Sequence, residues 1–199
     1  MPDLSLRRCA WVDLRKQDYV DYHDREWGVP VHDDRKMFEF LVLESSQAGL
    51  SWYTVLRKRE NYRKAFAHFD PVVVAGYDET QLTSLLQDQG LIRNRAKLSA
   101  AIHNAGRFLE VAEAFGSFAA YLWRFVGGTP IVNAWRDQRD CPSTSAVSDA
   151  LAKDLKARGF RFLGSTVLYS HLQATGLIND HLCDCFRHRE VQLLAKRSA

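Results

Sequence analysis

The sequence predicts an all-α protein, and three observations support this prediction. Apolar residues recur at helical spacing in one segment after another along the 199 residues. Strand signals are short and isolated, and glycine or proline stands where one helical pattern ends and the next begins. The chain shows no internal repeat. We therefore expect a single domain over residues 1–199, with an ordered core at about 8–185 and a flexible tail at 187–199.

The first half of the chain contains two long helical patterns and the start of a third. Met37 and Leu41 lie one helical turn apart within residues 34–48, and a similar apolar pattern continues over residues 52–66. Pro71 suits the first turn of another helix, because the missing N–H of proline costs nothing there.

The next two predicted helices form a hairpin. Residues 79–88 and 94–115 read as amphipathic helices joined by a tight turn that contains Gly90. Residues 117–126 then give a short helical pattern that is rich in aromatic side chains.

A loop interrupts the helical patterns over residues 127–144, where two glycines and two prolines occur with little periodicity. Ser145 is a candidate N-cap for a helix that ends at Arg158. Residues 164–175 predict one more helix, which Gly176 ends.

Charge and composition narrow the function classes. The net charge of +3 is compatible with nucleic acid but does not demand it, since the basic runs could be ordinary solvated helix faces. The runs are Arg57, Lys58, Arg59, Arg63 and Lys64; Arg93, Arg95 and Lys97; and Lys153, Lys156, Arg158 and Arg161. No signal peptide or membrane span is visible. We expect a soluble, cytoplasmic protein with no membrane partner and no disulfide framework.

A histidine and a cysteine near the C-terminus have the spacing of a metal-binding pair. His181 and Cys185 are four residues apart, so both side chains face one side of a helix or turn. Zinc takes four thiolate or imidazole ligands, and Cys9 and His23 are the candidates for the second pair. Four protein ligands would leave no position for a catalytic water, which favours a structural zinc ion.

Spacing alone leaves alternatives to this ligand set. His32 could replace His23, and Cys183 could compete with Cys185. The pair could also be a core cysteine and a surface histidine, because a single H-x3-C spacing often occurs by chance.

Aromatic residues gather around one carboxylate in the first quarter of the chain. Glu44 lies in an apolar helical pattern, where an unpaired carboxylate is costly to bury. It is a helix-surface residue, the partner of an arginine, or the acid at the edge of an aromatic box. Such a box suits a flat cationic heterocycle, since ring faces attract cations and a carboxylate accepts hydrogen bonds from an amino group. The candidate walls are Trp11, Tyr19, Tyr22, Trp27, Trp52 and Tyr53.

Two short segments are candidates for contact with nucleic acid. Gly49 permits a close backbone approach, and Leu50 could enter a base stack as an apolar wedge, although such a leucine is more often core. Gly90 precedes a helix start, where phosphate oxygens are favoured, and Arg93 and Arg95 follow it. The alternative is an ordinary corner between two helices.

Together these motifs resemble the 3-methyladenine DNA glycosylase I family of the helix–hairpin–helix superfamily. The resemblance covers roughly residues 8–185, and its most specific motifs are YHDREWG and QAGLSW. The matching segments are CAW at 9–11, YHDREWGVP at 22–30, LESSQAGLSWYTVLRKRENYRKAF at 43–66, GLIRNRAK at 90–97, STSAVSDALAKDLKARGF at 143–160 and GLINDHLCDC at 176–185.

The resemblance implies a two-lobe helical fold and a role for each site residue. One structural zinc per chain would bind to Cys9, His23, His181 and Cys185. The base pocket would consist of Tyr19, Tyr22, Trp27, Glu44 and Trp52. Gly49 and Leu50 would plug the gap left by the extracted base, and Gly90, Arg93 and Arg95 would contact phosphates. Glu44 is the candidate catalytic residue, and we assign it chiefly to recognition. No aspartate occurs from residue 89 to 136 and Asn94 stands in the turn, which fits a monofunctional enzyme.

The implied activity is hydrolysis of the N-glycosidic bond of 3-methyladenine in alkylated double-stranded DNA, with 3-methylguanine as a further candidate substrate. This is the first step of base excision repair, and we expect a monomer to perform it. The methylated base carries a positive charge and leaves as a neutral molecule, so no general acid is needed. The alternatives are a catalytically silent lesion binder, a bifunctional glycosylase/lyase and a zinc-dependent hydrolase of small molecules.

Overall fold

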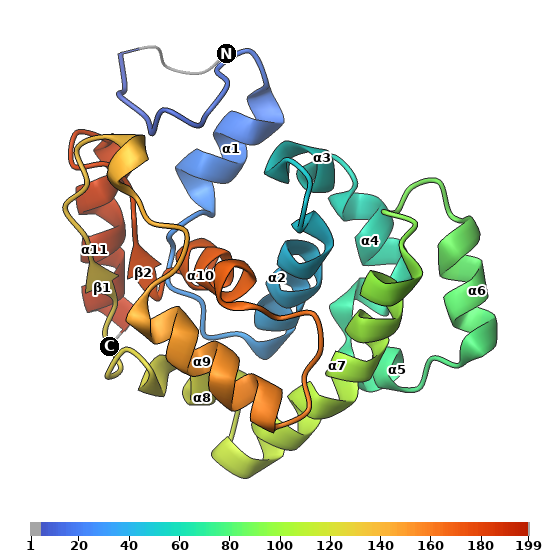
Figure 1. The fold of residues 1–199 in the computed structure, drawn as a ribbon. Helices are drawn as coiled ribbons and strands as arrows, with labels where there is room; N and C mark the ends of the chain where they lie inside the picture. Colours follow the sequence, from blue (N-terminus) through green and yellow to red (C-terminus); the bar gives the residue numbers. More distant parts are fainter. Residues whose placement is uncertain (1–4, 199) are drawn as a thin grey trace.

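The computed structural model describes residues 5–198, most of which are helical (Figure 1). The helices are α1 (Gln17–Arg25), α2 (Asp34–Gln47), α3 (Trp52–Leu56), α4 (Arg59–Ala65), α5 (Pro71–Ala75), α6 (Glu79–Gln87), α7 (Arg95–Phe115), α8 (Phe118–Arg124), α9 (Ala146–Ala157), α10 (Ser165–Ala174) and α11 (Phe186–Ser198), with 3-10 turns η1 (Ala67–Phe69) and η2 (Gln138–Asp140). Strands β1 (Ile131–Val132) and β2 (Ile178–Asn179) form one short parallel pair. The predicted helical class is confirmed, with this two-residue bridge as an addition.

Polar side chains determine where several helices begin. The carboxylate of Asp33 accepts a hydrogen bond from the N–H of Lys36 at 2.8 Å and caps α2, and Asn94 caps α7 in the same way. Ser145, the predicted N-cap of α9, accepts from the N–H of Ser148 in a capping box. These side chains satisfy N–H groups that have no partner inside the helix, so local sequence sets the boundaries.

Most helices match their predicted ranges to within a residue or two at each end, but the predicted helix over 52–66 is wrong as a continuous element. It divides between α3 and α4. The break turns Arg59 inward, where its guanidinium bonds the carboxylates of Glu26 and Glu39, each at 2.8 Å. A local apolar pattern cannot reveal such a long-range contact.

The C-terminal segment is a helix where the sequence predicts a flexible tail over 187–199. Helix α11 begins at Phe186 and continues through Ser198; Ala199 and residues 1–4 lie outside the described residues. The side chain of Val191 is 2% exposed, and Asn179 on β2 donates a hydrogen bond to the carbonyl of His188. These tertiary contacts fix a helix whose own sequence is mostly basic and polar. Helix α1 was likewise not predicted.

Helix α2 lies at the centre of the fold and packs against α3, α7, α8 and α10 (Figure 1). Every residue from 37 to 46 is buried. Helices α4 to α7 lie on one side of α2, and α1, α8, α9 and α11 lie on the other (Figure 1). Side chains on different faces of α2 therefore face different parts of the chain.

Candidate functional site

A cavity of about 340 Å³ contains the predicted carboxylate and most of the predicted aromatic walls. The residues that line it are Trp11, Tyr19, Tyr22, Trp27, Glu44, Gln47, Trp52, Gln138, Cys141, Ser170 and Gln173. The structure thus brings together five side chains that the sequence assigns to the base pocket. Tyr53 is outside the cavity lining, and its ring packs at a tilt against Tyr19 with the ring centroids 5.2 Å apart.

Four short elements place the aromatic rings around the cavity. Tyr19 and Tyr22 are three residues apart on α1 and so lie on one face of that helix. Tyr22 is 5.2 Å from Trp52, the first residue of α3, between ring centroids. Trp11 lies 5.1 Å from both Tyr19 and Trp27. The tilted and edge-on angles of these pairs keep the ring faces from closing on one another.

Glu44 projects from α2 and is only 4% exposed. No hydrogen bond to its carboxyl group is found among residues 5–198, and Arg59 is occupied by Glu26 and Glu39. Both alternatives from the sequence, a surface glutamate and the partner of an arginine, are therefore wrong. Burial raises the pKa of Glu44 to about 8, because the ionised form loses its hydration without gaining a partner.

The indole N–H of Trp52 is buried and has no hydrogen-bond acceptor among the described residues. A buried donor of this kind normally has a partner, and leaving it without one costs about 1–3 kcal/mol. The cavity therefore offers a ligand an unpaired acid beside the ring of Trp52.

Polar residues that the sequence analysis missed form the other wall of the cavity. Gln138 and Cys141 come from the loop over 127–144, and Ser170 and Gln173 come from α10. Two polar residues three positions apart on a mostly buried helix were an available signal for the α10 pair. The loop residues carry no such signal, because an irregular segment has no periodicity.

A second group, of two cysteines and two histidines, lies beside the aromatic cavity. Cys9, His23, His181 and Cys185 are buried, and one ligand atom from each lies within 4.8 Å of every other. Three sulfur-to-nitrogen distances are 3.5 Å: Cys9 to His181, Cys185 to His23 and Cys185 to His181. Tetrahedral zinc with its usual bond lengths requires a sulfur-to-nitrogen separation of about 3.5 Å. The four residues fit a metal ion.

The outward-facing nitrogens of the two histidines are fixed by hydrogen bonds. Nδ1 of His23 lies 2.8 Å from Asp24 Oδ1, and Nε2 of His181 lies 3.0 Å from the carbonyl of Trp27. Each ring must donate a proton there, so its other nitrogen carries a lone pair towards the group. A Cβ on Gly28 would lie 2.9 Å from the His181 ring, and the φ of Gly28 is +79°, so glycine is required for this close packing.

The two rival ligands lie elsewhere. His32 stacks on Trp123, with ring centroids 4.8 Å apart. Cys183 is exposed, whereas Cys185 is buried within the group. All four cysteines of the chain are free thiols.

The loop after α2 presents the predicted plug. Gly49 has a φ of +81°, and the side chain of Leu50 is 38% exposed. Lys97 on α7 is buried, and its ammonium group donates to the carbonyls of Ser46 (2.9 Å) and Ala48 (2.5 Å). A cation at the C-terminal end of a helix stabilises its unpaired carbonyls. Lys97 thus connects the plug loop to the predicted hairpin.

The turn between α6 and α7 has the predicted hairpin form. Arg93 and Arg95 are exposed, and Arg95 pairs with Glu79 on the preceding helix. Among residues 5–198, no acceptor is found for the backbone N–H groups of Arg95 and Ala96 in the first turn of α7. The N–H of Gly90 donates to Asp88 Oδ1 at 2.7 Å and is not free. The helix start and its arginines, rather than Gly90, are available to an anion.

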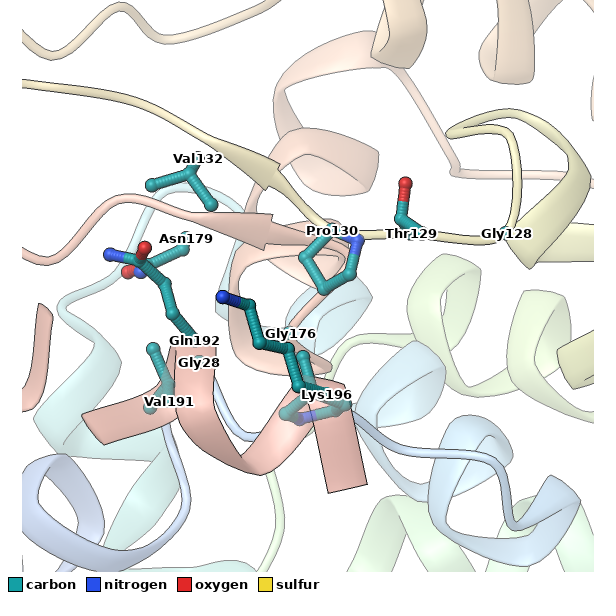
Figure 2. A pocket seen from close by; sticks show the side chains of 12 residues that line it. Gly28, Gly128, Thr129, Pro130, Val132, Gly176, Asn179, Val191, Gln192 and Lys196 are labelled. Carbon is teal, nitrogen blue, oxygen red and sulfur yellow. The ribbon is translucent and has the colours of Figure 1, made fainter. Parts of the chain in front are cut away.

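A second cavity, of about 230 Å³, lies between α11, β1 and the loop that contains Gly28 (Figure 2). Its lining is mostly apolar, with Pro130, Val132 and Val191 around the space and the Lys196 side chain beside it (Figure 2). It shares no residue with the aromatic cavity. It contains no carboxylate and no aromatic ring, so the aromatic cavity is the candidate site.

Comparison with known proteins gives consistent matches along nearly the whole chain. Residues 11–188 match the family model described as methyladenine glycosylase. The chain is 48% identical to DNA-3-methyladenine glycosylase 1 of Escherichia coli (strain K12), over 90% of this chain and 96% of the relative. It is also 48% identical to the DNA-3-methyladenine glycosylase of Haemophilus influenzae, over 89% and 96%.

Solved structures agree with these sequence matches. A crystal structure of 3-methyladenine DNA glycosylase I superposes with a TM-score of 0.88 at 49% identity and covers 90% of this chain and 98% of its own. The Staphylococcus aureus 3-methyladenine DNA glycosylase I, described for its 3-methyladenine recognition, gives a TM-score of 0.87 at 37% identity, over 91% and 96%. No helix in the described part of the chain is long and apolar enough to cross a membrane.

Proposed function

The chain belongs to the methyladenine glycosylase family, and we propose that it acts as a DNA-3-methyladenine glycosylase I in the repair of alkylated DNA. The observation that supports this most directly is the cavity in which aromatic rings surround the buried, unpaired Glu44. A flat base that carries a positive charge matches both features, because rings attract cations and the charge lowers the cost of ionising a buried acid.

The charge of the substrate drives departure of the base, and the cavity recognises the base. Extraction of the base from the duplex costs a few kcal/mol and is easier for a weakened pair. The bond between the base nitrogen and the sugar C1′ then breaks, and its electron pair neutralises the charge on the base. A water oxygen forms the new bond to C1′ and releases a proton to solvent. The enzyme needs no acid for the leaving group, so Glu44 serves chiefly recognition of the base.

The aromatic residues hold the extracted base, and the plug fills the space it leaves. Tyr19, Tyr22, Trp27 and Trp52 line the cavity beside Glu44. Leu50 is exposed on a turn that Gly49 makes possible, which suits insertion into a base stack. Stacking supplies affinity, and the carboxyl group selects the charged, amino-bearing base.

The duplex is held by its phosphates at the hairpin. Arg93, Arg95 and the free N–H groups at the start of α7 contact phosphate oxygens, with Gly90 forming the turn. Such contacts position the DNA and carry no sequence information. We expect one copy of the chain to bind one lesion site in the cytoplasm.

One structural zinc ion binds at the second site. Cys9, His23, His181 and Cys185 would hold it, and four protein ligands leave no open position for water. The metal joins the N-terminal loop to the C-terminal segment and supports Tyr22 and Trp27 from outside the cavity. It takes no part in the chemistry.

Release of free 3-methyladenine from methylated duplex DNA by the purified protein tests the proposal. Chromatography of the released bases should show 3-methyladenine as the main product, with little 7-methylguanine. Binding of the methylated duplex without release would instead make the protein a lesion binder. Covalent trapping by borohydride would indicate lyase chemistry.

A further inference from the structure

A buried carboxylate behind the cavity wall accepts hydrogen bonds from five side chains. Asp180 is 3% exposed. Oδ1 accepts from Asn133 Nδ2 (2.7 Å) and Trp135 Nε1 (2.7 Å), and Oδ2 accepts from Tyr169 OH (2.5 Å), Gln173 Nε2 (2.6 Å) and Cys141 Sγ (3.6 Å). Two of these donors, Gln173 and Cys141, also line the aromatic cavity.

This network determines the orientation of the Gln173 amide group. Its NH₂ group donates to Asp180 Oδ2 and lies 3.7 Å from Cys141 Sγ. The opposite orientation would place Oε1 against a carboxylate oxygen, and two acceptors repel each other at that distance. Burial and the neighbouring Asp180 charge raise the pKa of the Cys141 thiol to about 12, so the thiol keeps its proton. The carboxylate thus faces donors only.

The carbonyl oxygen of the same amide belongs to a side chain that lines the cavity. No donor to Gln173 Oε1 is found in the part of the chain that the structure describes. The network therefore turns a side chain that could donate or accept into one that only accepts. Ser170, on the same helix and in the same wall, differs because its hydroxyl donates to the carbonyl of Thr166 at 3.3 Å.

We propose that Gln173 is a specificity-determining residue. Its carbonyl oxygen, oriented by the hydrogen bond from the amide nitrogen to Asp180, selects a base with an amino group at position 6 over a base with an oxygen at position 6. The inference rests on the proposed function and extends it. An exocyclic amino group has two hydrogens, so it can donate to both Glu44 and Gln173. A 6-oxo base would place an acceptor against the fixed acceptor, which is a costly mismatch for a site built to hydrogen-bond.

The test compares two free bases that differ only at position 6, 3-methyladenine and 3-methylhypoxanthine. Quenching of tryptophan fluorescence from the cavity measures each affinity. We expect the wild type to prefer 3-methyladenine and Gln173→Met, which keeps the length but loses the acceptor, to reduce that preference about three- to tenfold. Thr166→Ala, at an exposed position of the same helix outside the cavity lining, is the matched control and should leave the preference unchanged. Gln173→Ala replaces the methionine variant if thermal unfolding shows that the latter does not fold.

The possible outcomes separate this inference from the proposed function. An unchanged preference in folded Gln173→Met would overturn the role of Gln173, even if the variant still excises 3-methyladenine. An equal loss of affinity for both bases would also overturn it, because it would indicate shape alone. Failure of the wild type to bind or release 3-methyladenine would overturn the proposed function itself.

Discussion

Glu44 combines two properties that rarely occur together: it is buried, and it lacks an ionic partner. A carboxyl group in this position remains protonated near neutral pH until a cation arrives. The arrival of a positively charged base favours ionisation, so the acid can discriminate between charged and neutral bases. Under the proposed function, the raised pKa of Glu44 would contribute to recognition of the base.

Replacement of this acid by its amide tests its role. Glu44→Gln keeps the shape and one acceptor oxygen but loses the charge. The loss of a charge-assisted hydrogen bond costs roughly 1.5–3 kcal/mol, so single-turnover release of 3-methyladenine should slow about ten- to a hundredfold. Residual excision should persist, because the base leaves without a proton from the enzyme. A fall of many orders of magnitude with intact free-base affinity would make Glu44 a chemical participant.

The raised pKa of Glu44 also predicts a pH-dependent stability. The pKa is about 8 in the folded protein and 4.5 for the free group, so the unfolded chain ionises more readily between these values. Folding is therefore penalised increasingly as pH rises from about 4.5 to 8. Glu44→Gln lacks this penalty and should be more stable than wild type at pH 8, by a few kcal/mol at most, and no more stable near pH 4.5.

Urea unfolding of both proteins at several pH values measures this difference. Effects of other titrating groups cancel in the comparison, since both proteins contain them. A stability difference that does not change between the two ends of the range would show that Glu44 ionises normally in the cavity.

Part of the site could be predicted from residues close together in the sequence, and part could not. The box of Tyr19, Tyr22, Trp27 and Trp52 around Glu44 was predicted because aromatic residues cluster within one stretch of sequence. Gln173 and Cys141 were missed, because they reach the cavity through folding of distant segments. Their significance depends on Asp180, whose contacts are all tertiary.

The elements show where local rules suffice and where they fail. Caps such as Asp33, Asn94 and Ser145 mark helix starts in the sequence itself, and those boundaries were predicted closely. The break between α3 and α4 and the order of α11 depend on contacts from elsewhere, through Arg59 and Val191. Helical periodicity contains no information about such contacts.

The hairpin of α6 and α7 should carry the salt-dependent part of DNA binding. Replacing both Arg93 and Arg95 with alanine should weaken binding to any duplex, and each lost phosphate contact should reduce the slope of log affinity against log salt by about 0.9. Arg95 must exchange its pairing with Glu79 for a phosphate, so it should contribute less than Arg93.

Titration of an unmodified duplex at several salt concentrations measures both slopes. Lys153→Ala with Lys156→Ala is the matched control, because it removes two exposed cations from α9, away from the hairpin (Figure 1). If the arginine pair and the control give the same slope as wild type, the hairpin does not contact the duplex.

At the scale of the whole molecule, the group of Cys9, His23, His181 and Cys185 joins the N-terminal and C-terminal regions of the chain. Cys9 and His181 are 172 positions apart and contribute ligands to one site. Next to it, Tyr22 and His23 are neighbours on α1, and Trp27 lies between the His181 ring and the cavity, 4.5 Å from that ring. A metal ion would therefore stabilise the fold and fix one wall of the base pocket without touching the base.

Metal analysis should find about one zinc per purified chain. Cys185→Ser should lose it, while Cys183→Ser, which changes an exposed cysteine two positions away, should retain it. Cross-linking segments this far apart restricts the unfolded chain by about 5 kcal/mol in a chain-entropy estimate, so the zinc-free variant should unfold at a clearly lower denaturant concentration. Because the metal supports the pocket from outside, affinity for 3-methyladenine should fall together with stability.

Full zinc retention in Cys185→Ser would instead indicate that Cys183 is the ligand. Loss of activity on chelation before any loss of stability would make the metal catalytic.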